Sequence, residues 1–309
     1  MKDAAARPRC SVLARANDEP LFATAPVSQA WLLLEHPGPW GADALAESSI
    51  DPEVASEVNR RSKEHGFRIL LVRRSSGRNG GSGRSCFLVR AAQGETWMER
   101  LDLADVTDLL DIDPALLANS SAPGVGEPVE HLWAVCTHGR RDPCCAEHGR
   151  RLVRLGFTGD GLAEHLWESS HQGGHRFAAN LAIFPHGLFY GMVEPDDAER
   201  IVGAYRDGRI VLDHYRGRSA LDAVAQAADY LARRETGITG IDDLRVRASR
   251  QLADGEFEVT LLADDRRLRV RLRTVEGPMR PESCNKPGLT PIRSFEELGV
   301  EGVQESPTI

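Results

Sequence analysis

Four side chains of metal-binding type constrain the fold of this chain more than any other feature. They are Cys136 and Cys145, then His171 and His175, in Cys136-Thr-His-Gly-Arg-Arg-Asp-Pro-Cys-Cys145 and His171-Gln-Gly-Gly-His175. Two thiolates and two imidazoles form a ligand set for a zinc ion or for a mixed-ligand [2Fe–2S] cluster. If they share one centre, the fold must bring two distant stretches of the chain together.

Length and charge narrow the class of protein. A chain of 309 residues predicts two domains, and a hydrophobic fraction of 41% is ordinary for a globular protein. The net charge of −8 argues against nucleic acid or an anionic membrane as the main partner. The first ten residues lack the apolar core of a signal peptide, and the longest apolar runs are too short to cross a bilayer. The sequence therefore predicts a cytoplasmic protein.

Short apolar runs predict strands in the first part of the chain, at residues 30–35, 67–73 and 86–91. A stretch rich in Ser, Pro and Gly at residues 119–128 is the best candidate for a linker. The sequence thus predicts an N-terminal mixed α/β domain over residues 1–128.

After the linker, strand and helix signals alternate. A buried strand at 132–135 ends at Cys136, a helix is expected at 146–155, and a hairpin and two more helices follow, with a strand at 209–214 between them. This order is compatible with a thioredoxin-like sandwich over residues 129–237, although periodicity alone does not select that fold.

The last part of the chain has a different pattern. Three segments between residues 244 and 274 alternate apolar and charged side chains and are separated by turn residues. This pattern predicts a three-stranded antiparallel meander, placed in a C-terminal β extension and tail over residues 238–309.

The ligand spacing is unusual for zinc. Zinc fingers have short spacers, but eight residues separate Cys136 from Cys145, and twenty-five separate Cys145 from His171. The two glycines between His171 and His175 cost about 2 kcal/mol of helix propensity, so a turn is expected there. Zinc does not forbid this spacing, and a structural zinc module for protein interaction remains an alternative.

The same residues suit an iron–sulfur cluster, in which each iron needs two protein ligands. They would meet if Cys136 follows a strand, Cys145 starts a helix and a Gly-rich loop carries the two histidines. Backbone N–H groups at the helix start would then face the thiolates. Two imidazoles in place of two thiolates raise the reduction potential by about several hundred millivolts. Because a ligand imidazole keeps a second N–H, electron transfer is expected to be coupled to proton transfer.

A thiol redox site built on Cys144 and Cys145, or on Cys136 and Cys145, is a weaker hypothesis. Neighbouring cysteines form a disulfide only with difficulty, the chain has no Cys-x-x-Cys motif, and the histidines would be left unexplained. Three further cysteines are scattered along the chain: Cys10, Cys86 and Cys284. Isolated cysteines of this kind are usually small buried hydrophobic residues.

The spacing Cys136-x8-Cys145 followed by His171-x-Gly-Gly-His175 resembles that of the sucrase/ferredoxin-like family. Supporting stretches are residues 21–26, 31–41, 136–142 and 167–180. The resemblance covers about residues 10–235 and implies a thioredoxin-like [2Fe–2S] ferredoxin core. It also implies that Cys136 and Cys145 bind one iron and that His171 and His175 bind the other. A swap of Cys145 for its neighbour Cys144 stays open.

The sequence therefore predicts an α/β protein in which a thioredoxin-like ferredoxin domain follows a mixed α/β domain and precedes a small antiparallel β extension. The predicted function is one-electron transfer through a [2Fe–2S] cluster, with a reductase or an electron acceptor as the protein partner and with neither nucleic acid nor a membrane. An electron carrier is favoured over a stand-alone oxidoreductase. A structural zinc module and a partner-dependent reductase, for example of ferric chelates, are the alternatives. No pair of carboxylates for sugar hydrolysis stands out.

Overall fold

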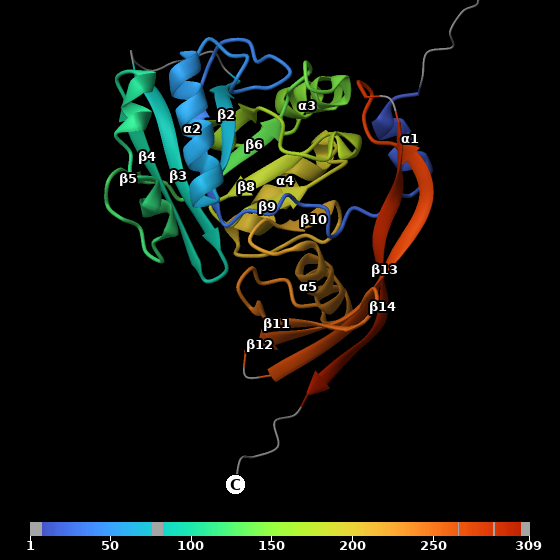
Figure 1. The fold of residues 1–309 in the computed structure, drawn as a ribbon. Coiled ribbons are helices and arrows are strands. Elements are labelled where there is room, and N and C mark those ends of the chain that lie inside the picture. Colours follow the sequence, from blue (N-terminus) through green and yellow to red (C-terminus); the bar gives the residue numbers. More distant parts are fainter. Residues whose placement is uncertain (1–7, 76–82, 265, 287, 304–309) are drawn as a thin grey trace, which may run out of the picture.

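One ten-stranded mixed sheet and one four-stranded antiparallel sheet organise the molecule (Figure 1). The computed structural model describes residues 8–75, 83–264, 266–286 and 288–303. Most of the segment considered above for a signal peptide, and the tail from residue 304, lie outside these ranges. The large sheet has the strand order β10-β9-β8-β6-β7-β2-β1-β3-β4-β5. The predicted mixed α/β class is therefore confirmed.

The first half of the large sheet is a β-α-β unit followed by two antiparallel strands. β1 pairs with β2 in parallel and with β3 antiparallel, and β3 pairs antiparallel with β4. The elements of this half are α1 (Cys10–Ala16), β1 (Ala30–Glu35), α2 (Pro52–His65), β2 (Arg68–Arg74), β3 (Arg84–Ala92), β4 (Glu95–Leu103), two 3-10 helices (Val106–Leu110 and Pro114–Ala118) and β5 (Glu127–Pro128).

The second half repeats this arrangement. β6 pairs with β7 in parallel and with β8 antiparallel, and β8 pairs antiparallel with β9. Both connecting helices begin with an Asp N-cap and a proline, Asp51-Pro52 in α2 and Asp142-Pro143 in α3. The elements of this half are β6 (Leu132–Cys136), α3 (Pro143–Leu155), a 3-10 helix (Ala163–His165), β7 (Leu166–Ser169), a 3-10 helix (His175–Phe177), β8 (Leu181–Phe184), β9 (Leu188–Tyr190), α4 (Pro195–Arg206), β10 (Tyr215–Arg218) and α5 (Ala223–Thr236).

The two halves are joined edge to edge into one sheet. β2 pairs antiparallel with β7, and Arg73 donates to Glu168 across that pair at 2.7 Å. Alternate residues of β1 face opposite sides of the sheet: Leu32 packs in a core beside α2, whereas Trp31 packs in a core shared with Phe184 of the other half. The predicted boundary at residue 128 thus lies within a continuous sheet, and the division into 1–128 and 129–237 remains a prediction about folding units.

Two expected elements differ in the structure, and one strand was not expected. Residues 209–214 form no strand; the strand is β10, whose Arg216 and Arg218 are buried cations that a hydropathy pattern does not identify as strand residues. β7 was not expected because its four residues mix apolar and polar side chains. Helix α3 begins at Pro143 rather than at residue 146, because the Asp142 side chain accepts a hydrogen bond from the Cys144 backbone N–H.

The C-terminal extension is a four-stranded sheet rather than the predicted three-stranded meander. Its strands are β11 (Leu244–Ala253), β12 (Glu256–Ala263), β13 (Arg266–Pro281) and β14 (Leu289–Val303). Pro291 and Gly299 interrupt the alternating pattern of β14, which is why the sequence did not identify it. The sheet packs on α5, and the β13–β14 hairpin extends beyond it to reach α1 and α3 (Figure 1). None of the helices in the described ranges has the length and apolar run needed to span a bilayer.

Candidate metal centre

Two of the predicted ligands meet where β6 ends and α3 begins. Cys136 is the last residue of β6, and Cys145 lies in the first turn of α3. Both side chains are fully buried. Gly149 lets α3 approach β6 this closely, because a Cβ atom at that position would stand 2.0 Å from the Cys136 carbonyl oxygen. Strand, helix start and glycine together bring both thiols to one end of the sheet.

The two histidines lie on the loop between β7 and β8, and the turn expected there is present. Gly173 and Gly174 have φ values of 87° and 72°, a left-handed conformation that glycine adopts without strain. The buried Gln172 side chain donates to the Ala134 carbonyl at 2.7 Å and so anchors the loop to β6. The loop is therefore fixed by its own backbone conformation and by hydrogen bonds to the sheet.

Three of the four predicted ligands form a compact cluster, and the fourth lies beside it. The ligand atoms of Cys136, Cys145 and His171 all lie within 4.8 Å of one another, and Cys145 Sγ is 3.8 Å from His171 Nδ1. The imidazole of His175 stacks on that of His171 at 5.3 Å between ring centroids. We call Cys136, Cys145, His171 and His175 the Cys/His group. Its assignment as a ligand set remains a prediction.

His175 also faces a different set of side chains. Its Nδ1 lies 3.5 Å from an Asp142 carboxylate oxygen and 3.7 Å from the Cys10 sulfur. Burial lowers the pKa of His175 to about 4, which favours the neutral imidazole that metal ions bind. A carboxylate next to the other nitrogen of a ligand imidazole is the arrangement that orients metal-bound histidines in many proteins.

A buried arginine lies behind the loop. Arg216 on β10 donates to the Gly173 carbonyl at 3.1 Å and to the Asn180 side chain at 2.8 Å. Burial lowers the pKa of Arg216 to about 9, while the charges of Cys136 and Cys145 act in the opposite direction. The guanidinium therefore both holds the loop and offsets negative charge on the two thiols.

His138, in the loop after β6, fixes the position of His171. Its Nε2 is 2.5 Å from the Gly41 carbonyl oxygen, and its Nδ1 accepts the backbone N–H of His171 at 3.2 Å. Burial lowers the pKa of His138, which keeps the ring neutral so that Nδ1 can accept that hydrogen bond. This side chain links the first half of the molecule to the histidine loop.

The two thiols of the Cys/His group differ in pKa. Contact with Cys145 holds the pKa of Cys136 well below its usual value, and the same contact raises the pKa of Cys145. One thiolate therefore forms more readily than the second, because two neighbouring negative charges would repel each other. A metal cation next to both sulfurs removes this repulsion.

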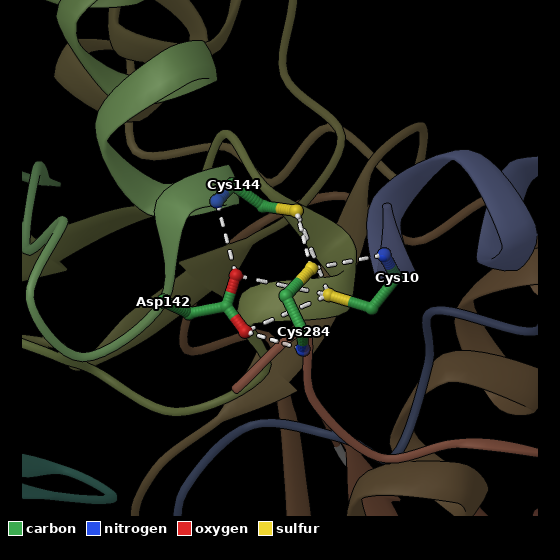
Figure 2. A group of neighbouring side chains, drawn as sticks. All are labelled: Cys10, Asp142, Cys144 and Cys284. Carbon is green, nitrogen blue, oxygen red and sulfur yellow. Dashed lines mark hydrogen bonds between the residues drawn. The ribbon is translucent and has the colours of Figure 1, made fainter. Parts of the chain in front are cut away.

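A second group of cysteines, which sequence reasoning missed, is drawn in Figure 2, and His175 of the first group contacts two of its members. It consists of Cys10, Asp142, Cys144 and Cys284, whose ligand atoms also lie within 4.8 Å of one another. We call it the three-cysteine group. Cys10 and Cys284 are therefore not isolated, although Cys10 is buried as expected, and Cys86 lies in an apolar core. No local spacing relates residues 10, 144 and 284, so a motif search has no means of finding them.

Open surface borders the Cys/His group on two sides. His171 lines a pocket of about 330 Å³ together with His138, Arg141 and Ser170. A broader groove of about 750 Å³ runs along α3, from Pro143 to Arg154. Six arginines line this groove: Arg9, Arg73, Arg140, Arg150, Arg151 and Arg154. Glu147 also lines the groove and pairs with Arg9, so basic side chains outnumber acidic ones on this surface of an otherwise acidic chain.

One comparison with known protein families covers a large part of the chain. A model of the sucrase/ferredoxin-like family matches residues 21–217, which is more than half of the sequence. This span contains the whole Cys/His group but neither Cys10 nor Cys284. The three-cysteine group therefore depends on residues outside the matched region.

Two fungal relatives also match. Altered inheritance of mitochondria protein 32 of Meyerozyma guilliermondii is 34% identical over 97 residues, which is 28% of this chain and 34% of that protein. The protein of the same name from Candida glabrata is 29% identical over 100 residues, 28% of this chain and 32% of that protein. The alignments thus span about a third of these relatives. No solved structure matches the chain.

Proposed function

The chain belongs to the sucrase/ferredoxin-like family, and we propose that it transfers single electrons through a [2Fe–2S] cluster held by Cys136, Cys145, His171 and His175. The observation that carries the proposal is the convergence of two buried thiols and an imidazole within 4.8 Å, with a second imidazole stacked on the first. When bound, such a cluster accepts and releases one electron at a time. The names of the fungal relatives refer to mitochondrial inheritance and not to electron transfer. The electron-transfer role is therefore proposed here from the site.

The surroundings of the Cys/His group suit an anionic cluster. Cys145 lies in the first turn of α3, where the positive end of the helix dipole favours negative charge. The buried guanidinium of Arg216 adds a full positive charge on the side of the histidine loop. Both features stabilise thiolate and sulfide in a site from which water is largely excluded.

The strand pattern supports a thioredoxin-like core for this half. A β-α-β unit, β6-α3-β7, is followed by the hairpin β8–β9 and the helix α4. The cluster ligands would then sit at the carboxyl end of β6 and the start of α3. In the first half of the molecule, Glu35 and Asp51-Pro52-Glu53 stand at the corresponding ends and carry no thiol.

Proton exchange with solvent is available on the histidine side. His171 borders the pocket described above, so its ring can exchange a proton with water there. The Nδ1 atom of His175 instead lies next to the Asp142 carboxylate. We therefore assign the proton that accompanies the electron to His171 and a positioning role to the Asp142 carboxylate.

The basic groove is the docking surface in this proposal. Its six arginines line a groove along α3, the helix whose first turn carries Cys145. Charge complementarity predicts a protein partner with an acidic face, either a reductase or an electron acceptor. A cytoplasmic setting, with its reduced thiols, is part of the same proposal.

A zinc ion is the second candidate for this site. Three ligand atoms within 4.8 Å of one another also fit one tetrahedral ion. In that case the protein would be a structural binding module without redox activity.

Anaerobic purification followed by iron and acid-labile sulfide analysis separates the two candidates. The cluster predicts about two irons and two sulfides per chain and a red-brown protein that dithionite bleaches. A colourless protein with neither iron nor sulfide would overturn the electron-transfer proposal and support the zinc module.

A further inference from the structure

Three cysteines from distant parts of the chain converge beside the Cys/His group. Cys10 lies at the start of α1, Cys144 in the first turn of α3, and Cys284 in the connection between β13 and β14. Figure 2 shows their sulfurs and the Asp142 carboxylate pointing toward one another. Cys144 Sγ lies 3.6 Å from Cys10 Sγ and 3.5 Å from Cys284 Sγ. Within the described residues, only this group draws ligands from both ends of the chain.

The separations match a tetrahedral thiolate site. A zinc ion with Zn–S bonds of about 2.3 Å places its sulfurs about 3.8 Å apart. The two sulfur–sulfur distances here fall slightly below that value, and both carboxylate oxygens of Asp142 lie 3.8 Å from Cys10 Sγ. Three sulfurs and one oxygen therefore surround a point that a small metal ion fits with little movement.

The carboxylate of Asp142 is held in place by the segments that it joins. It accepts the backbone N–H of Cys144 and of Cys284 at 3.0 Å each, and the Ser283 hydroxyl at 3.0 Å. Hydrogen bonds that orient a ligand carboxylate in this way are typical of metal sites. The four side chains are thus fixed by the backbone and not gathered by chance at a flexible surface.

Charge also favours a cation in this group. Cys10, Cys144 and Asp142 are almost completely buried, and Cys284 is half-buried. Arg176 and Arg280 lie nearby, but both pair with Glu19. A divalent ion would offset the thiolate and carboxylate charges in a region where unpaired charge is costly. Soft thiolates with one oxygen select zinc among the common divalent ions.

A disulfide explains the group less well. A disulfide needs two sulfurs about 2.05 Å apart, whereas Cys144 Sγ lies 3.5 Å from Cys284 Sγ and 3.6 Å from Cys10 Sγ. It would also leave the third thiol and the carboxylate without a role.

We propose that Cys10, Cys144, Cys284 and Asp142 bind one zinc ion, which ties α1 and the β13–β14 connection to the first turn of α3. The ion closes loops of well over a hundred residues, so it restricts the unfolded chain strongly. It also fixes the surroundings of His175, whose Nδ1 touches both Cys10 and Asp142. Cys144 and Cys145 would then serve two different metal centres.

Metal analysis of the full-length protein tests the site. Wild type and the variants Cys10→Ala, Cys284→Ala and Cys86→Ala are purified after growth with added zinc and iron, and zinc, iron and sulfide are measured per chain. We expect Cys10→Ala and Cys284→Ala each to bind one zinc ion fewer than wild type and to retain iron and sulfide. Cys86→Ala, a buried cysteine outside both groups, should keep all three. The zinc difference holds whichever metal occupies the Cys/His group, so the two proposals fail separately.

A second measurement guards against variants that do not fold. Wild-type protein is alkylated with iodoacetamide before and after zinc removal with a chelator, and each cysteine is then mapped by mass spectrometry. We expect the half-buried Cys284 to be protected before and labelled after zinc removal, because a zinc-bound thiolate reacts slowly. Equal zinc in wild type and both variants, equal labelling with and without chelator, or a disulfide among the three cysteines would each overturn the proposal.

Discussion

The Cys/His group and the three-cysteine group lie side by side but are assembled in different ways. The Cys/His group comes from one β-α-β unit and the loop that follows it, residues 136–175, within the region that matches the family. The three-cysteine group joins the first helix, the start of α3 and the connection between the last two strands. The first is a local motif, and the second exists only after the ends of the chain have folded onto the core.

The difference is sharpest at two adjacent residues. Cys144 and Cys145 both lie in the first turn of α3, where consecutive side chains point about 100° apart around the helix axis. One sulfur therefore faces Cys10 and Cys284, and the other faces Cys136 and His171. Neighbours in sequence are thus expected to have separate chemical roles.

The largest effect is expected from exchanging these two neighbours for alanine, one at a time. Cys145→Ala should lose nearly all iron and sulfide, because a [2Fe–2S] cluster needs two ligands for each iron. Cys144→Ala should keep both and lose one zinc ion. Metal and sulfide analysis of the two proteins, each a control for the other, checks this. Equal loss of iron from both would show that the two groups are not separate.

The next effect concerns the reduction potential. His171→Cys adds one negative charge to the ligand set, so the oxidised cluster is stabilised and the potential should fall by about 150 mV. Voltammetry on the purified variant measures the shift. His65→Asn, at the exposed end of α2, is the control and should leave the potential unchanged. A His171→Cys potential equal to that of wild type would remove His171 from the ligand set.

Packing between α3 and β6 should matter more than helix propensity. Gly149→Ala places a Cβ atom 2.0 Å from the Cys136 carbonyl oxygen, so the free energy of unfolding should fall by about 2–3 kcal/mol. Gly203→Ala, in α4 with no atom within 4 Å of the new Cβ, should raise it by about 0.5–1 kcal/mol. Urea unfolding followed by circular dichroism compares the two. A Gly149→Ala protein as stable as wild type would contradict the close approach of helix and strand.

The smallest effect is expected at the edge of the three-cysteine group. Ser283→Ala removes one hydrogen bond to Asp142, so zinc affinity should fall about tenfold while iron content stays constant. Competition with a coloured zinc chelator gives the affinity, and Ser249→Ala, exposed on β11, serves as the matched control. Unchanged zinc affinity in Ser283→Ala would show that Asp142 does not need this hydrogen bond to take part in the group.

Sequence patterns predicted the secondary structure around the Cys/His group better than the rest of the chain. The strand that leads to Cys136, the turn at Gly173-Gly174 and the hairpin after it all produce local signals of periodicity or turn chemistry. The strand β10 escaped prediction because its buried arginines look like surface residues in a hydropathy pattern. The strands β7 and β14 escaped it for local reasons as well, the mixed side chains of β7 and the Pro291 and Gly299 of β14.

The three-cysteine group is an omission of another kind. Cys10 and Cys284 gain a common role only because the β13–β14 hairpin extends beyond its sheet to α1 and α3 (Figure 1). The spacing of residues 10, 144 and 284 in the sequence does not predict that contact. The repeat of one strand arrangement in both halves was equally hidden, because the first half keeps the Asp-Pro helix start but has no thiol beside it.

Pulsed electron paramagnetic resonance of the dithionite-reduced protein, with and without ¹⁵N-labelled histidine, tests the central claim most directly. The account predicts a paramagnetic [2Fe–2S] signal coupled to two histidine nitrogens, those of His171 and His175. A reduced protein without such a signal, or with a signal that ¹⁵N-histidine leaves unchanged, would contradict it.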